Sequence, residues 1–118
     1  MSFESIFSQL SQLMMLYADR LVLNENTRDN INIFTHHIMD NKKPLYFGGV
    51  KINKKYVSYH LMPVYVFPDL LESITPELKK RMQGKSCFNF SKDDPVLFSE
   101  LKELTQQGYE RYQAAGYL

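Results

Sequence analysis

The sequence predicts an α+β fold, with a mostly antiparallel small sheet packed against N- and C-terminal helices and a short helix between strands. Apolar residues recur at spacings of three and four in residues 2–21 and again in residues 95–115, which indicates two amphipathic helices. Residues 45–52 predict a strand, residues 56–62 predict a second strand with two alternating faces, and the three-residue polar turn between them makes the pair an antiparallel hairpin. A third strand is expected at residues 86–90. We expect the terminal helices to cover one face of this sheet.

The segment between the first helix and the hairpin has a weaker pattern. Residues 24–30 are polar and predict a turn. Ile31 and Ile33 alternate with asparagines, which predicts a short strand. Residues 35–41 fit either a helical turn or a loop. Inside the first hairpin strand, the pair Gly48-Gly49 predicts a bulge or a close approach of another backbone.

Proline and cap residues mark the remaining boundaries. Pro63 ends the second hairpin strand because proline has no backbone N–H to donate, and residues 64–68 are expected to turn the chain back over the sheet. Thr75-Pro76-Glu77 predicts a helix start, with an end near Gln83 and a left-handed stop at Gly84.

The last helix shows the same cap-and-proline pattern at Asp94-Pro95. Gly108 lies inside that helix, where glycine costs about 1 kcal/mol relative to alanine. We therefore expect Gly108 to mark a place where another backbone packs closely.

Composition bounds the class of protein. A chain of 118 residues predicts one domain, residues 1–118. Fourteen basic and thirteen acidic side chains give a net charge of +1, from which we expect no nucleic-acid partner. A single cysteine forms no internal disulfide, and we see no secretory leader, so we expect a cytoplasmic protein. No apolar run reaches about 18 residues, so we expect no membrane partner.

Four residues form the predicted ligand-binding site: Tyr56, His60, Phe67 and Cys87. We expect them near a small cleft between the sheet and the corner formed by residues 63–68. Cys87 is either a thiolate nucleophile or metal ligand tuned by Lys85 or Arg81, or a small buried residue. His60, on the polar face of its strand, is either an acid–base group or ligand, or a hydrogen-bonded strand histidine.

Other groups of residues have two interpretations each. The aromatic residues of the middle segment either line a pocket or fill the core: Tyr46, Tyr56, Tyr59, Tyr65, Phe67, Phe88 and Phe90. The lysines around the hairpin either meet an anionic partner or protect a sheet edge: Lys42, Lys43, Lys51, Lys54 and Lys55. His36 and Asp40 have the spacing of half a metal site, but nothing nearby in sequence completes it.

The segments PLYFGGV, KKYVSYHLMPVY, FPDLL, ELKKRMQGKSCFNF and ERYQAAGYL resemble the YdhG-like domain of unknown function. The resemblance covers nearly all of the chain and is densest from Pro44 to Phe90. It implies a small, bacterial, cytoplasmic α+β protein. Some members of that family are described as frataxin-like iron chaperones, so the resemblance also implies iron as a possible cofactor or cargo.

Frataxin-type iron binding uses an acidic ridge on the first helix and the adjoining strand. The predicted first helix here carries only Glu4 and Asp19, fifteen residues apart. At 1.5 Å per residue they would stand about 22 Å apart along the axis, too far to share an ion.

Three functional hypotheses follow. The first is a non-enzymatic binding protein whose partner is a small molecule, a metal ion or another protein. The second is a small enzyme that uses Cys87 or His60. The third is an interaction module that dimerises through a sheet edge or through the tyrosines of the last helix, Tyr109, Tyr112 and Tyr117. For the chain as a whole we expect a monomer or a weak homodimer.

Overall fold

A five-stranded antiparallel sheet with the strand order β1-β2-β3-β4-β5 forms the centre of the protein. The computed structural model describes residues 3–118. The strands are β1 (Val22–Asn26), β2 (Asn30–Ile38), β3 (Pro44–Ile52), β4 (Val57–Leu61) and β5 (Cys87–Phe90). The helices are α1 (Phe3–Met15), α2 (Pro63–Val66), the 3-10 helix η1 (Pro68–Ser73), α3 (Pro76–Lys79) and α4 (Pro95–Ala114). The α+β prediction is confirmed.

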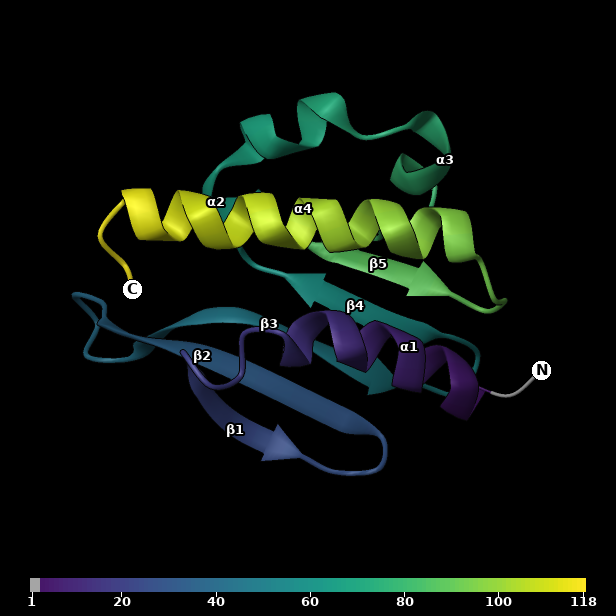
Figure 1. The fold of residues 1–118 in the computed structure, drawn as a ribbon, viewed down its shortest axis with the longest axis horizontal. Helices are drawn as coiled ribbons and strands as arrows, with labels where there is room; N and C mark the ends of the chain where they lie inside the picture. Colours follow the sequence, from purple (N-terminus) through teal and green to yellow (C-terminus); the bar gives the residue numbers. More distant parts are fainter. Residues whose placement is uncertain (1–2) are drawn as a thin grey trace.

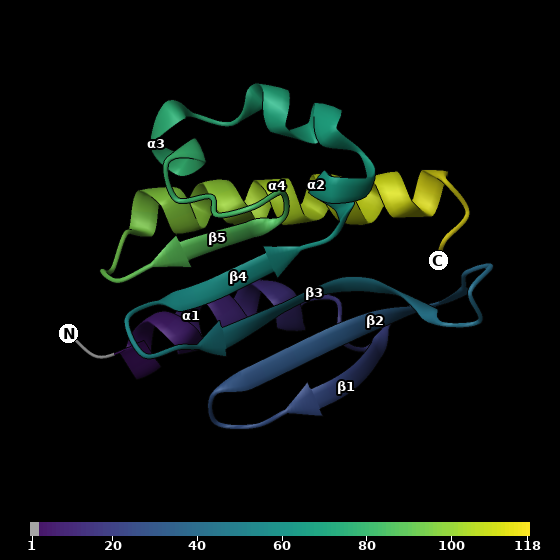
Figure 2. The same ribbon diagram turned by 180° about the vertical axis from the view of Figure 1, so that it is seen from behind.

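The two long helices cover the same face of the sheet. In Figure 1, α1 and α4 lie in front of the strands, and Figure 2 shows the strands from behind, with no helix in front of β1 to β4. The helical side is closed by aromatic packing, in which Tyr17 stacks on Tyr109 with ring centroids 4.6 Å apart. We call the opposite face, which no helix covers, the outer face.

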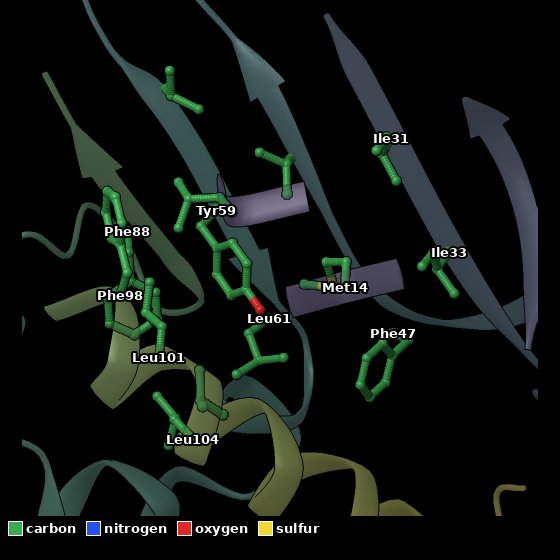
Figure 3. Close-up of a cluster of buried hydrophobic side chains, with 14 of the residues drawn as sticks. Met14, Ile31, Ile33, Phe47, Tyr59, Leu61, Phe88, Phe98, Leu101 and Leu104 are labelled. Carbon is green, nitrogen blue, oxygen red and sulfur yellow. The ribbon is translucent and has the colours of Figure 1, made fainter. Parts of the chain in front are cut away.

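The core lies between the sheet and the long helices, as Figure 3 shows. Val57, Tyr59 and Leu61 of β4 are all buried, as their alternation predicted. The Tyr59 hydroxyl lies 2.5 Å from the Thr105 hydroxyl of α4, and this contact joins β4 to the helix. Because successive residues of a strand point to opposite faces, the residues between them, Ser58 and His60, point to the outer face.

Gly48 and Gly49 lie where β3 approaches its neighbours most closely. A Cβ atom on Gly49 would overlap the carbonyl oxygen of Ile31, and one on Gly48 would lie 2.5 Å from the carbonyl oxygen of His60. The register between β2 and β3 also shifts next to this pair, after Ile33. The predicted bulge and close approach are both present.

Several predicted boundaries were wrong. The first helix ends at Met15 rather than at residue 21, and turns follow it. Its predicted start at residue 2 lies outside the described residues. The segment predicted as a turn at residues 24–30 contributes to β1, which extends to Asn26, because it pairs with β2. Residues 35–38 are neither a helical turn nor a loop but continue β2.

The cap predictions at the later helices are confirmed, with one length corrected. The Thr75 hydroxyl accepts a hydrogen bond from the Leu78 N–H, and the Asp94 side chain accepts one from the Leu97 N–H. The helix after Thr75 is only four residues long, because residues 81–83 leave it to pair with β5. Gly84 has the predicted positive φ of 79°, but in the turn before β5.

Gly108 packs against the chain reversal after β4. A Cβ atom at this position would lie 2.8 Å from Cβ of Pro63. The close neighbour is therefore a proline ring rather than the backbone that we expected. This contact fixes α4 against the start of α2.

Candidate functional site

A polar pocket of about 360 Å³ opens on the outer face, over β4 and β5. Side chains from β3, β4, β5 and two turns line it: Lys51, Asn53, Tyr56, Ser58, His60, Gln83, Cys87 and Asn89. Three of the four predicted site residues, Tyr56, His60 and Cys87, therefore lie together. We call this site the polar pocket.

The register of the sheet brings His60 and Cys87 side by side. They are directly opposite each other in the antiparallel pair β4–β5, as are Ser58 and Asn89. The Leu61 N–H donates to the Ser86 carbonyl, so the alternation of the ladder makes His60–Cys87 a non-hydrogen-bonded pair. Side chains are closest in such pairs, which explains how two residues 27 positions apart share one pocket.

A chain of hydrogen bonds runs across the floor of the polar pocket. Asn53 Nδ2 donates to Ser58 Oγ at 2.8 Å, and Ser58 Oγ donates to Asn89 Oδ1 at 3.0 Å. Asn89 Nδ2 then donates to Gln83 Oε1 at 2.6 Å. The Cys87 thiol donates to the same Asn89 oxygen at 3.3 Å. These bonds fix the orientation of the three amide side chains, Asn53, Asn89 and Gln83, before anything binds.

Gln83 reaches the pocket because its segment extends the sheet. The Gln83 N–H donates to the Cys87 carbonyl, and the Asn89 N–H donates to the Arg81 carbonyl. Residues 81–83 therefore cover the outer edge of β5. This pairing also shields the β5 edge from pairing with another chain.

The His60 imidazole lies in the polar pocket without a hydrogen-bond partner among the described residues. The side chain is half-buried. Burial lowers the pKa of His60 below its usual value of 6.5, so the ring is neutral at pH 7. A neutral imidazole offers one donor and one acceptor to a bound molecule.

The lowered pKa of His60 predicts how stability changes with pH. As the pH falls through 6.5, the unfolded chain takes up a proton before the folded one, so the free energy of unfolding decreases. This contribution is at most about 1.4 kcal/mol per pH unit. Urea denaturation between pH 8 and 5 should show a shallower pH dependence for His60→Asn than for the exposed control His36→Asn. Equal slopes in the two variants would contradict the buried neutral state of His60.

Cys87 is not an activated nucleophile in this environment. Burial raises the pKa of the Cys87 thiol above its usual value of 9.0 and outweighs the opposing effect of the Ser58 hydroxyl. The predicted depression by Lys85 or Arg81 is therefore wrong, because desolvation dominates. Cys87 is half-buried and donates to Asn89. This environment fits the second interpretation of Cys87, a small buried residue, better than the first.

Alkylation kinetics test this state of Cys87. With a pKa above 9.0, less than about 1% of the thiol is ionised at pH 7, so the native protein should react with iodoacetamide more slowly than the urea-unfolded chain. The rate should rise without a plateau up to pH 9. A plateau below pH 8 would identify a low-pKa thiolate and support the enzyme hypothesis.

Phe67 lies away from the other three predicted site residues. Its ring packs on the helical side, 6.3 Å from the Tyr112 ring and 6.4 Å from the Tyr117 ring, with the Arg111 guanidinium 5.0 Å above it. The corner at residues 63–68 does border a hollow, an apolar groove of about 740 Å³. That groove is lined by Val64, Tyr65, Pro68, Leu71, Lys79, Met82, Gly84 and Lys85, so it shares no residue with the polar pocket.

Five lining residues lie outside the predicted site: Lys51, which was named only among the hairpin lysines, and Asn53, Ser58, Gln83 and Asn89, which were not singled out. Two of them carried a usable signal, because Ser58 alternates with Tyr59 and Asn89 alternates with Phe88 along their strands. Asn53 and Gln83 belong to turns. Their arrival at the pocket depends on the pairing of β3 with β4 and of residues 81–83 with β5.

The remaining aromatic candidates divide between the core and the surface. Tyr59, Phe88 and Phe90 fill the core, whereas Tyr65 is half exposed, with the Lys85 ammonium 5.9 Å from the centroid of its ring. Tyr109 and Tyr112 are buried, so these two tyrosines do not form an exposed patch for pairing; the alternative of pairing through a sheet edge stays a prediction.

No metal site is evident in residues 3–118, where no three His, Cys, Asp or Glu side chains are grouped so that they could hold an ion. His36 is exposed, and His37 packs against Tyr117 with ring centroids 4.8 Å apart. Glu4 is on α1, whereas Asp19 lies beyond the end of that helix. The iron handling implied by the resemblance stays a prediction, which line broadening in a ferrous-iron titration followed by NMR would test.

Comparisons with family models, with curated proteins and with solved structures found no match to the chain. Over residues 3–118, no helix combines the length and the apolar character needed to cross a membrane.

Proposed function

We propose that the protein is a small-ligand-binding domain that holds its ligand on the outer face of the sheet, in the polar pocket. The observation that carries this proposal is the half-buried, unpartnered imidazole of His60 among side chains already fixed by hydrogen bonds. An imidazole in such a position has lost part of its water and regains hydrogen bonds when a polar molecule binds. The pocket volume of about 360 Å³ lies within the usual range of small-molecule sites.

The polar pocket is largely preformed. The hydrogen-bonded amides of Asn89 and Gln83 are preorganised, so binding requires little additional ordering. The apolar groove at the corner is larger, but its lining offers only Tyr65 and two lysines as polar groups.

The polar pocket supports binding better than covalent catalysis. Nucleophilic catalysis by cysteine requires a thiolate, and burial keeps the Cys87 thiol protonated. Cys87 and His60 are both neutral at pH 7, because burial shifts their pKa values in opposite directions. We therefore assign both residues to the wall of a binding site.

Thermal denaturation with a panel of polar small molecules tests the proposal. A ligand that binds only the folded protein at 100 times its Kd adds about 2.7 kcal/mol to stability and raises Tm. The rise should vanish in Asn89→Ala, which removes the centre of the hydrogen-bond chain, and persist in Asn26→Ala, an exposed asparagine on β1. Each variant is compared with its own ligand-free Tm.

Two results would overturn the proposal. One is a panel of neutral, anionic and cationic compounds in which none raises Tm at millimolar concentration. The other is a stabilising compound whose effect is equal in Asn89→Ala and Asn26→Ala, because its site would then lie elsewhere.

A further inference from the structure

A second pocket of about 380 Å³ lies next to the polar pocket and shares three of its residues, Tyr56, Gln83 and Asn89. Its remaining lining is Lys55, Lys80, Arg81, Met82 and Ser91. We call it the basic pocket. The two hollows adjoin each other across these three side chains. Together they run from His60 to the start of the residue 91–94 turn, and we call the pair the depression.

The charge of this depression is one-sided. Lys55, Lys80 and Arg81 line the basic pocket, and Lys51 lines the polar pocket. No Asp or Glu lines either one. Four cations therefore surround the depression in a chain whose net charge is only +1.

These cations are not neutralised within the protein. Over residues 3–118 the one ion pair joins Arg111 to Asp69, on the other side of the molecule from the outer face. Lys51, Lys55, Lys80 and Arg81 are all exposed and take part in no ion pair with the described residues. Their mutual repulsion is relieved when an anion binds between them.

The two halves of the depression differ in what they can bind. The basic pocket concentrates three cations, including an arginine whose planar guanidinium matches the oxygens of a phosphate group. The polar pocket offers amide, hydroxyl and imidazole groups with a single lysine. A molecule that fits both halves has a multiply charged anionic end and an uncharged end rich in hydrogen-bonding groups.

We infer that the ligand of the proposed binding site is a small phosphorylated molecule, with its phosphate or diphosphate among Lys55, Lys80 and Arg81 and its uncharged polar end beside His60, Ser58 and Asn89. This inference rests on the proposed function. A phosphate monoester carries about −1.5 to −2 charges at pH 7, and a diphosphate carries more, which matches several cations better than a single carboxylate does.

A small molecule fits better than a nucleic-acid strand. The cations surround two joined hollows of about 360 and 380 Å³ and do not extend as a stripe along the sheet. The opposite end of the outer face carries a carboxylate, because Glu25 of β1 accepts hydrogen bonds from Asn30 and Asn32 there. A polyanion laid across the strands would meet that negative charge.

Isothermal titration with inorganic pyrophosphate tests the inference, with the double variant Lys55→Glu/Lys80→Glu as the probe of the site. Both lysines are exposed, so the double variant should fold, which circular dichroism can verify. Reversing two charges near the anion should weaken pyrophosphate binding about tenfold or more at low salt. The control Lys43→Glu/Lys102→Glu changes the same number of exposed charges away from the depression and should stay within about twofold of the wild type.

Each remaining outcome contradicts the inference in a different way. Equal losses in the two double variants would mean that pyrophosphate responds only to net charge. Tighter binding of a single-stranded oligonucleotide than of pyrophosphate would indicate a nucleic-acid surface instead. If a neutral compound binds with dependence on Asn89 but pyrophosphate does not bind, the phosphate assignment fails and the proposed function stands. If neither binds, both fail.

Discussion

Replacing Tyr59 by alanine is expected to lower the free energy of unfolding by about 3–5 kcal/mol, the usual cost of removing a fully buried aromatic side chain. Tyr59 is 0% exposed, and its ring fills the space between β4 and α4 (Figure 3). The same strand carries Ser58 and His60 on its other face, so the packing of Tyr59 also holds the polar pocket in place. Urea denaturation followed by circular dichroism measures the loss.

The conservative variant separates packing from hydrogen bonding. Tyr59→Phe keeps the ring and removes the hydroxyl that meets Thr105, so it should cost about 1 kcal/mol. In Tyr59→Phe, the Thr105 hydroxyl still donates to the Leu101 carbonyl. If Tyr59→Phe were as damaging as Tyr59→Ala, the ring would not be packed as described.

Replacing Gly49 by alanine is the second change with a large expected effect, a loss of about 3 kcal/mol in the free energy of unfolding. The added Cβ would overlap the Ile31 carbonyl oxygen on the neighbouring strand, and this backbone atom cannot rotate away. It would also come within 2.6 Å of Asn32 Oδ1. The same denaturation experiment measures this loss.

Gly84→Ala provides the matched control for Gly49→Ala. Nothing lies within 4 Å of a Cβ at Gly84, so only its positive φ of 79° opposes a side chain. That conformation costs roughly 1–2 kcal/mol for a residue other than glycine. A smaller loss for Gly49→Ala than for Gly84→Ala would contradict the close contact between β2 and β3.

The sequence predicted the elements in which burial imposes a clear period. The alternation of Val57, Tyr59 and Leu61 identified β4 and its buried face, and the caps at Thr75 and Asp94 located two helix starts. β1 was missed because its residues, Val-Leu-Asn-Glu-Asn, are mostly exposed and gain their strand geometry from pairing with β2. Tertiary pairing here outweighs local preference.

The candidate site was predictable only where it follows strand alternation. His60 and Cys87 were singled out from their own strands, and the register of β4 with β5 then placed them together. Phe67 was misplaced because the direction of the corner after Pro63 depends on its packing against α4, which the sequence does not encode locally. The basic pocket depends on residues 80–81 lying near Lys55, a contact between segments 25 residues apart.

The most direct test of the central claim, that the outer face is the ligand surface, is a map of amide chemical shifts during a pyrophosphate titration. The account predicts shifts for Lys55, Lys80, Arg81, Gln83 and Asn89, which line the basic pocket, with α1 and the part of the apolar groove formed by Val64, Pro68 and Leu71 unchanged. Shifts confined to that groove or to the helical side, with none around Asn89, would contradict it.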